Sequence, residues 1–380
     1  MFAGFFRELK YLINHKWDLS LVTLAPLVII LLFSSMFYQG KPEHLPIAVV
    51  DQDRSELSRQ IKKYLTHQST LHIELVTQNL SDAERKLNQN KIWGYVVIPA
   101  GAEQRLVHAE DAQIGIFFNQ SYFSVGNSIS SAMFVSSLEG IQDYMRQHYL
   151  VRHLPELELP TATVKISPLY NPDLNYELYL EPYMIPAILH LLLCCCVAFS
   201  VGQELKFKTT ATWVMGGPAW RALITKNLIY VFIFSFWTWV WMFWLIEVRG
   251  WFVVGQLWVI IFAQFLLYCA YAFISSAMVL ATQNLSKTFG LIAVYGGSSL
   301  SFAGVTLPLN NAPLFTQIWA NIIPYTPYAK LQTQQWVVGS PLSTSLLPFF
   351  ILILYAVLYF ILALFLLKHR LKAGKNETIF

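Results

Sequence analysis

Six apolar stretches dominate this chain, and each is close to the length that a helix needs to cross a bilayer, about 20 residues. Mean hydropathy is +0.46. Charged residues make up 13% of the chain, whereas soluble domains have about 25%. The sequence therefore predicts a membrane all-α protein with six transmembrane helices. The predicted spans are Leu19–Tyr38, Tyr183–Val201, Leu228–Ile246, Leu257–Ala281, Phe289–Leu307 and Leu346–Leu367.

Lysines and arginines next to the spans predict which side of the membrane each segment faces. With the N-terminus inside, the inside segments hold 12 of these residues, and the two short outside segments hold only Arg249 and Lys330. Cytoplasmic loops carry such an excess, whereas long domains cross largely regardless of charge and are left out of the count. We expect both termini in the cytoplasm and residues 40–181 outside it.

The long segment 40–181 alternates short apolar runs with helical spacing. Strands that alternate with helices predict an α/β arrangement. We therefore expect an inserted extracytoplasmic α/β domain, with a long helical extension at 121–152 and a strand at 162–166. Asp51 and Asp53 follow its first strand, where they are interpreted as turn and cap residues, with an acid pair or a metal site as the alternative.

Four shorter segments complete the predicted organisation. Residues 1–18 form a cytoplasmic amphipathic surface helix or, alternatively, an extension of the first span at 19–39. Residues 202–217 form a compact, charged connection within 182–368 that suits docking or a plain loop. Residues 308–345 hold five prolines among aromatic side chains, which predicts short helices that re-enter the outer membrane surface. Residues 369–380 form a cytoplasmic tail.

Catalytic motifs do not appear in the sequence. It contains no P-loop and no H-E-x-x-H zinc motif. His190 is the single histidine deep in a span, where a structural hydrogen bond is one interpretation and proton transfer the other. The adjacent Cys194, Cys195 and Cys196 point to different faces of a helix and are interpreted as small packing residues. A net charge of +4 with no basic stripe argues against nucleic-acid binding.

Five motifs follow one another along the chain. They are Phe6-Arg7-Glu8-Leu9 before a span with Pro26, Val49-Val50-Asp51-Gln52-Asp53-Arg54-Ser55-Glu56-Leu57-Ser58, Leu169-Tyr170-Asn171-Pro172-Asp173-Leu174, Gly202-Gln203-Glu204 leading to Thr209 and Lys226, and Ala320-Asn321-Ile322-Ile323-Pro324. In this order and spacing they resemble a type-2 ABC exporter permease of the subgroup with a large periplasmic domain between the first two spans. Two departures from the family pattern are Lys208, where relatives often have Gly, and Gln203, where they often have Arg.

The resemblance implies a permease subunit with no ATPase site of its own. Two such subunits, identical or paralogous, would dock on a separate cytoplasmic ABC ATP-binding subunit that holds ATP and Mg²⁺, so the chain itself would bind no cofactor. A periplasmic membrane-fusion protein is a further candidate partner. Arg7 and Lys10 on the surface helix would flank the docking groove. The residues implied in coupling to the ATPase, on a short coupling helix, are Gln203, Glu204, Lys206, Thr209 and Trp213.

Spans rich in Phe, Trp and Tyr and poor in charge suit an apolar or amphipathic cargo such as a drug or lipid. The expected function is therefore ATP-driven export across the bacterial inner membrane. One alternative is a membrane-anchored receptor or assembly protein that binds through its extracytoplasmic domain. A second is a membrane-embedded enzyme, which would need clustered ionisable residues within its spans.

Overall fold

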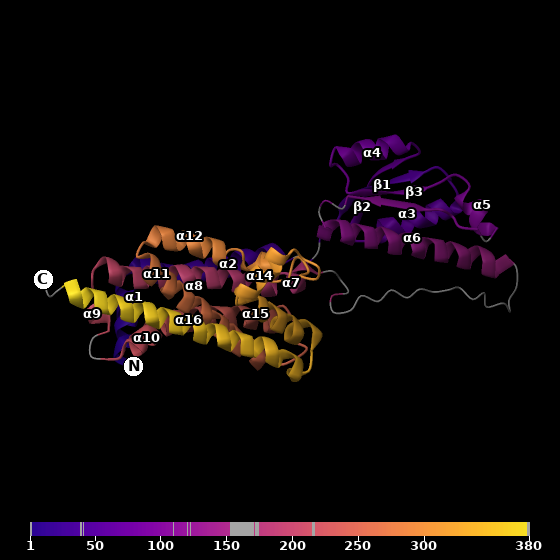
Figure 1. The fold of residues 1–380 in the computed structure, drawn as a ribbon. Coiled ribbons are helices and arrows are strands. Elements are labelled where there is room, and N and C mark those ends of the chain that lie inside the picture. The colour runs from indigo at the N-terminus through magenta and orange to yellow at the C-terminus, as the bar shows by residue number, and fades with distance from the viewer. Residues whose placement is uncertain are drawn as a thin grey trace. The chain divides into compact units, whose positions relative to one another are not determined.

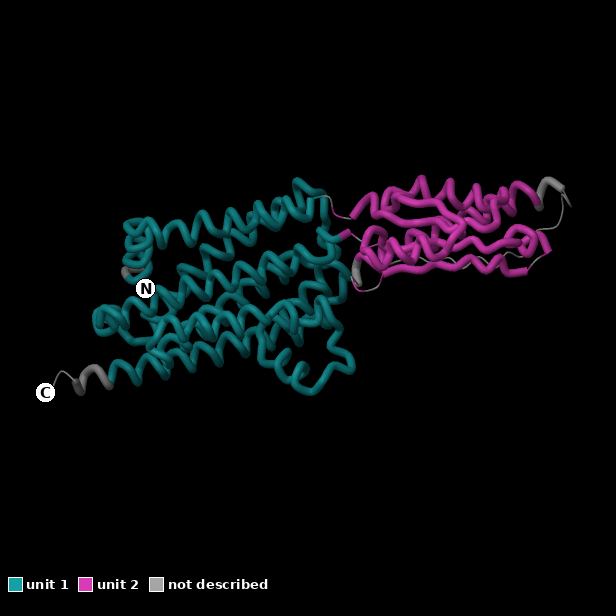
Figure 2. Tube along the Cα trace, turned by 90° about the horizontal axis from the view of Figure 1, so that it is seen from above, with its two compact units in different colours: residues 1–38, 176–380 teal, residues 39–175 magenta. Residues whose placement is uncertain are grey.

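Two groups of elements, separated after Tyr38 and before Tyr176, make up the chain (Figure 2). The computed structural model describes residues 2–38, 40, 42–108, 110–119, 121, 123–152, 171, 175–214 and 217–377. We call residues 1–38 with 176–380 the membrane unit, and residues 39–175 the inserted unit. The predicted strand at 162–166 lies outside the described residues.

All of the regular secondary structure in the described membrane unit is helical (Figure 1). Five of them are long and apolar enough to cross a membrane: α2, α8, α10 with its extension η1, α11 and α16. Most residues of α8 and α11 are buried, whereas only 22% of the apolar window of α2 and of α16 is buried, as expected of helices that face lipid. The elements are α1 (Phe2–Asn14), α2 (Lys16–Phe37), α7 (Tyr176–Tyr179), α8 (Glu181–Lys206), α9 (Thr210–Trp213), α10 (Ala219–Phe243), η1 (Trp244–Val248), α11 (Leu257–Thr282), α12 (Leu285–Tyr295), α13 (Ser299–Phe302), α14 (Leu314–Ile322), α15 (Tyr325–Gln332), η2 (Thr333–Val338) and α16 (Leu342–Glu377).

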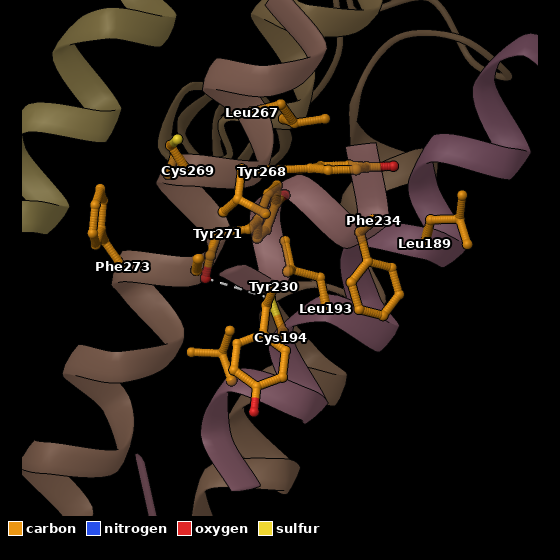
Figure 3. Close-up of a cluster of buried hydrophobic side chains, with 14 of the residues drawn as sticks. Leu189, Leu193, Cys194, Tyr230, Phe234, Leu267, Tyr268, Cys269, Tyr271 and Phe273 are labelled. Atoms are coloured by element: carbon orange, nitrogen blue, oxygen red, sulfur yellow. Dashed lines mark hydrogen bonds between the residues drawn. The ribbon is translucent and has the colours of Figure 1, made fainter. Parts of the chain in front are cut away.

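Tightly packed side chains from α8, α10 and α11 fill the centre of the membrane unit (Figure 3). Leu193 of α8, Phe234 of α10 and Tyr268 of α11 are all fully buried. Cys194 is buried among them, and its thiol donates to the backbone oxygen of Tyr271 over 3.5 Å. The cysteine therefore packs as a small apolar residue, as the sequence predicts.

The predicted fifth span, Phe289–Leu307, is not one continuous helix. The structure has α12 ending at Tyr295, a turn at 296–298 and the four-residue α13. The break falls on Gly296 and Gly297, and each glycine in a helix costs about 1 kcal/mol relative to alanine. Among the described residues, five helices rather than six reach membrane-spanning length.

Span boundaries also differ from the predicted ones. α8 starts at Glu181 and ends at Lys206, so it is longer than the predicted Tyr183–Val201 at both ends. α16 continues through most of the predicted tail to Glu377. The segment 308–345 forms α14, α15 and η2, which are short helices as predicted, whereas its re-entry into the membrane stays a prediction.

A four-stranded mixed sheet lies at the centre of the inserted unit, which confirms the predicted α/β insertion. The strand order is β2-β1-β3-β4, with β1 parallel to both of its neighbours and β4 antiparallel to β3. Its elements are β1 (Leu45–Asp51), α3 (Glu56–His67), β2 (Leu71–Thr77), α4 (Leu80–Asn88), β3 (Gly94–Ile98), α5 (Ala102–Val107), β4 (Gly115–Phe118) and α6 (Phe123–Arg152).

Both faces of the sheet are covered by helices (Figure 1). Ile47 and Val49 of β1 pack in a cluster with α3 and α6, and Ala48 and Val50 pack in a cluster with α4. A parallel strand buried on both faces reads as a continuous apolar run, which is the pattern at 47–50. At Gly140 of α6 a β-carbon would lie 2.8 Å from the Cα of Ile61, so only glycine allows this close helix contact.

Asp51 and Asp53 are turn and cap residues, as interpreted from the sequence. Asp53 accepts hydrogen bonds from the backbone N–H groups of Gly101, Ala102 and Glu103 over 2.7–3.1 Å, at the start of α5. The Asp51 carboxylate accepts from Lys62 Nζ over 2.7 Å, from Ser58 Oγ over 2.9 Å and from a backbone N–H at 2.8 Å.

Replacing Asp51 with Asn is expected to destabilise the inserted unit at neutral pH but not in acid. Burial alone would raise the pKa of Asp51, yet the hydrogen bonds from Lys62 and its other donors lower it overall. A carboxyl with a lowered pKa adds stability above its unfolded value, and this stability is lost as the pH falls through its folded pKa. A hydrogen bond to a charged group contributes about 1.5–3 kcal/mol.

Hydrogen exchange on the full chain would check this expectation. At pH 7, amides of β1 and α3 should exchange about tenfold faster in the Asn variant, which corresponds to about 1.4 kcal/mol. As the pH falls through the lowered pKa of Asp51, its carboxylate becomes protonated and the two proteins should converge. A difference that stays constant across this pH range would contradict the ionic role of Asp51.

Candidate functional site

α1 and the end of α16 lie at one end of the membrane unit, which we call the terminal end (Figure 1). Arg370 of α16 donates to the backbone oxygen of Leu280 in α11 over 3.1 Å there. Gly202 of α8 packs directly on Leu285 at the start of α12. A cavity of about 370 Å³ opens at this end and is lined by Arg7, Glu8, Tyr11, His15, Ser200, Gln203, Glu204, Phe207, Thr209, Thr212 and Lys226.

Lys226 stands at the centre of the polar groups around this cavity. It lies on α10 and is only 5% exposed. Its Nζ donates to Glu8 Oε2 and to Glu204 Oε1, each over 3.0 Å. The same Nζ lies 5.4 Å from the ring centre of Trp213 on α9. One buried ammonium thus contacts side chains from α1, α8 and α9.

Glu8 is the matching buried anion, with 3% of its surface exposed. Its Oε1 accepts a hydrogen bond from Ser200 of α8 and another from Tyr230 of α10 over 3.1 Å. Because a buried charge is costly unless it is paired and hydrogen-bonded, this full set of partners is what keeps an ionised Glu8 inside the protein.

Glu204 joins the end of α8 to the segment that follows it. Thr209 donates to Glu204 Oε2, and Arg7 Nη2 lies 3.5 Å from Glu204 Oε1. Arg7 also donates to the backbone oxygen of Thr212 over 3.2 Å. Two acids and two bases therefore balance, and α1, α8, α9 and α10 are linked at this end. We call Arg7, Glu8, Glu204 and Lys226 the four-charge cluster.

Gln203 extends the contact with α1 through Tyr11. The phenol of Tyr11 donates to Gln203 Oε1. Burial, followed in size by the nearby carboxylate of Asp18, raises the pKa of Tyr11 to about 12. The phenol therefore stays protonated at neutral pH and remains a donor.

Not every predicted coupling residue lies on a coupling helix. Gln203, Glu204 and Lys206 belong to the last turns of α8, Thr209 is the residue before α9, and only Trp213 lies on that short helix. α8 continues this far because no residue before Phe207 interrupts it. Trp213 is buried, with its indole donating to Ala222 over 3.3 Å, so it anchors α9 and does not face outward.

The backbone conformation at Lys208 explains why relatives often have Gly at this position. Its φ angle is +54°, in the left-handed region that glycine adopts at little cost. The sharp end of α8 thus needs a conformation for which glycine is the usual residue. Lys10 and Lys208 are both exposed, and each belongs to a segment that lines the cavity.

Glu8 and Lys226 belong to two of the motifs in the sequence, but the sequence predicts no role for either residue. Their pairing spans more than 200 residues of chain, so spacing could not show it. The available signal was a single acid on the amphipathic helix at 2–14 and a single lysine just before an apolar run. A charge at such a position needs a buried partner or an interfacial location.

A second polar cluster lies at the opposite end, where the chain leaves and re-enters the membrane unit at Tyr38 and Tyr176; we call this the insertion end. Arg249 pairs with Glu177 through Nε to Oε1 at 2.6 Å and Nη2 to Oε2 at 3.0 Å. Glu181, the first residue of α8, is fully buried nearby. The sequence placed Glu177 and Glu181 within the inserted domain at 40–181, which the structure corrects.

His190 has a structural environment. It is fully buried, its Nδ1 lies 3.2 Å from the backbone oxygen of Pro186, and its ring lies 4.0 Å from that of Tyr271. Among the described residues, no acidic or basic side chain forms a hydrogen bond with it. These contacts favour the structural interpretation over proton transfer.

Comparison with known proteins identifies the family. The family model described as "ABC-2 family transporter protein" matches residues 16–365, which covers nearly the whole chain. No curated protein and no solved structure matches it. This family supplies the membrane component of ABC transporters, which works with an ABC ATP-binding subunit. The membrane-length helices agree with that role, and the chain belongs to the ABC-2 family as a membrane-embedded transport permease.

Proposed function

We propose that this chain is the permease subunit of an ATP-driven exporter that moves an apolar or amphipathic molecule out of the cytoplasm or inner membrane. ATP and Mg²⁺ would bind on the partner ATPase. The observation that supports the proposal most is Lys226, which bonds to both Glu8 and Glu204. Because these bonds join α1, α8 and α10, a push on the connection after α8 would move the three helices together.

The exposed surface beside this cluster is the proposed docking site for the ATPase. Phe207 is 66% exposed at the turn after α8. Lys206, Lys208 and Arg221 around it are also exposed, as is Thr212. An exposed aromatic side chain among basic residues is typical of an interface anchor, because aromatic residues and Arg are enriched at interfaces.

Both termini are proposed to be cytoplasmic, which requires an even number of crossings. α1 and the end of α16 lie at the same end of the membrane unit (Figure 1). α11 ends at that end, whereas η2, just before α16, meets the start of α11 through Gly255 N–H to Gln335 O at 2.8 Å. The chain between them must return, and we propose that α12 and α13 make this sixth crossing as a broken helix.

The remaining assignments extend the same proposal. The chain would lie in a bacterial inner membrane with the inserted unit outside, paired with a second permease subunit that is identical or paralogous. A periplasmic membrane-fusion protein would be a further partner. The charge-poor, aromatic-rich helices support an apolar or amphipathic cargo, since burying a charge inside the bilayer is costly.

Replacing Phe207 with Ala is expected to weaken binding of the cognate ATPase subunit by about tenfold or more, as for an interface anchor. The four-charge cluster stays intact in this variant, so the permease itself should fold normally. Affinity can be measured by biolayer interferometry with the permease in nanodiscs.

Phe252→Ala is the matched control, because Phe252 is 73% exposed on the loop between η1 and α11, away from the terminal end. It should bind the ATPase like the wild type. Equal binding by the Phe207 variant and the wild type would reject the docking surface. Failure of the wild type to bind an ATPase encoded beside it would count against the permease proposal itself.

A further inference from the structure

Glu181 has an unusual environment for a carboxylate. It is fully buried at the start of α8. Its Oε1 accepts hydrogen bonds from Ser34 Oγ over 2.7 Å and from Trp241 Nε1 over 2.9 Å. Its Oε2 has no hydrogen-bond partner among the described residues. Two donors on one oxygen and none on the other leave half of this carboxylate unsatisfied.

Charge is also unbalanced around Glu181. The charged groups that act on it most strongly are Glu177 and Arg249. Arg249 is already committed to Glu177 through two bonds of 2.6 and 3.0 Å. Glu247, on the neighbouring η1, is exposed. Among the described residues, these two buried acids share one arginine, which leaves Glu181 without a cationic partner of its own. Protonation of Oε2 would create a donor that in turn lacks an acceptor.

A stacked pair of Trp side chains and two polar atoms without hydrogen-bond partners lie near this carboxylate. Trp241, which binds Glu181, stacks on Trp336 of η2 with ring centres 6.0 Å apart. The Nε1 of Trp336 and the Oε1 of Gln332 are buried without partners among the described residues. Gln332 donates its amide to Pro182, the neighbour of Glu181. A π-helix such as η2 is frequently found at functional sites.

We propose that Glu181 is the recognition point for a cationic headgroup, such as a primary ammonium on an apolar tail. An ammonium supplies the missing charge and an N–H donor for Oε2, and such a charge-assisted hydrogen bond is roughly twice as strong as a neutral one. The inference rests on the proposed permease function and narrows its cargo to cationic amphiphiles. The helices must part to admit the ligand, since Glu181 is fully buried.

Direct binding to the purified full chain in nanodiscs of neutral lipid tests the proposal. Tritiated dodecylammonium is the probe, and unlabelled dodecylammonium, dodecanol and dodecyl sulfate are the competitors. We expect saturable binding that the ammonium displaces and that the two others, with the same tail, do not. Glu181→Gln should bind the probe about tenfold or more weakly, whereas the exposed Glu247→Gln should match the wild type.

Two results would overturn the proposal. One is competition by dodecanol as strong as that by dodecylammonium, which needs only the wild type and so holds even if Glu181→Gln fails to fold. The other is unchanged affinity in a Glu181→Gln variant that melts like the wild type. The assay contains no ATPase, so its failure leaves the docking test intact, and failure of docking leaves the cation site intact.

Discussion

A Lys226→Met variant is expected to lose most of the order at the terminal end of the membrane unit. Removing one partner of a buried ion pair costs about 3–5 kcal/mol, because the remaining charge stays buried without compensation. Here Glu8, 3% exposed, would keep its bonds from Ser200 and Tyr230 but lose the ammonium. Glu204 would lose the same partner.

Hydrogen exchange of the purified full chain measures this effect. Amides of α1 should exchange more than about a hundredfold faster in Lys226→Met, as expected for a loss of about 3 kcal/mol. Lys287→Met is the control. It removes the same charge as Lys226→Met, but Lys287 is exposed at the start of α12. It should leave the exchange of α1 unchanged.

A double variant separates charge from packing. Glu8→Gln combined with Lys226→Met removes both charges and leaves an amide that still accepts from Ser200 and Tyr230. Replacing a buried pair together is often close to neutral, so the double variant should recover most of the protection of α1. A double variant as damaged as the single one would show that shape, not charge, makes Lys226 necessary.

Hydropathy alone located most of this architecture. α2, α8, α10, α11 and α16 all coincide with predicted spans, because about 20 apolar residues have few alternatives to a spanning helix. The fifth predicted span is broken into α12 and α13 rather than continuous, because a hydropathy count ignores the helix cost of Gly296 and Gly297. The continuous apolar run at 47–50 with its flanking turn predicted the sheet, since a strand buried on both faces has such a run.

Helix ends were less predictable, and they changed the interpretation of two residues. A span search stops at charge, so it left Glu181 outside the second span. Glu181 followed by Pro182 is nevertheless a helix-start signature, because an acid favours the first turn and Pro suits the first positions. The candidate cation site therefore lies just outside the predicted second span, Tyr183–Val201, and could not be found from the spans alone.

Contacts between distant residues could not be predicted from one sequence. The family pattern pointed to the segment 202–217, but not to the way Glu204 meets Lys226 or Arg7. It also placed Trp213 on the docking face, whereas the structure buries it. The exposed Phe207 was overlooked because one aromatic in a charged loop carries no periodic signal.

An Arg249→Met variant is expected to destabilise the insertion end of the membrane unit. Arg249 binds Glu177 at both carboxylate oxygens and donates to the backbone oxygen of Tyr38 over 2.7 Å. Tyr38 and Glu177 border the two points where the chain leaves and re-enters the membrane unit. The side chain of Arg249 is 20% exposed, so we expect about 3 kcal/mol, the lower end of the range for buried pairs.

The guanidinium shape of Arg249, not only its charge, should matter. A planar fork can hold both oxygens of Glu177 and stack on the ring of Tyr38, whose centre is 4.1 Å away. Arg249→Lys should therefore recover only part of the stability, and the exposed Arg221→Met should lose none. Exchange of the amides at 34–38 and 176–180 reports the loss locally, because these two stretches meet through Arg249. If exchange rises equally throughout α8 and α11, or does not rise in Arg249→Met, then Arg249 does not hold the two stretches together as the geometry indicates.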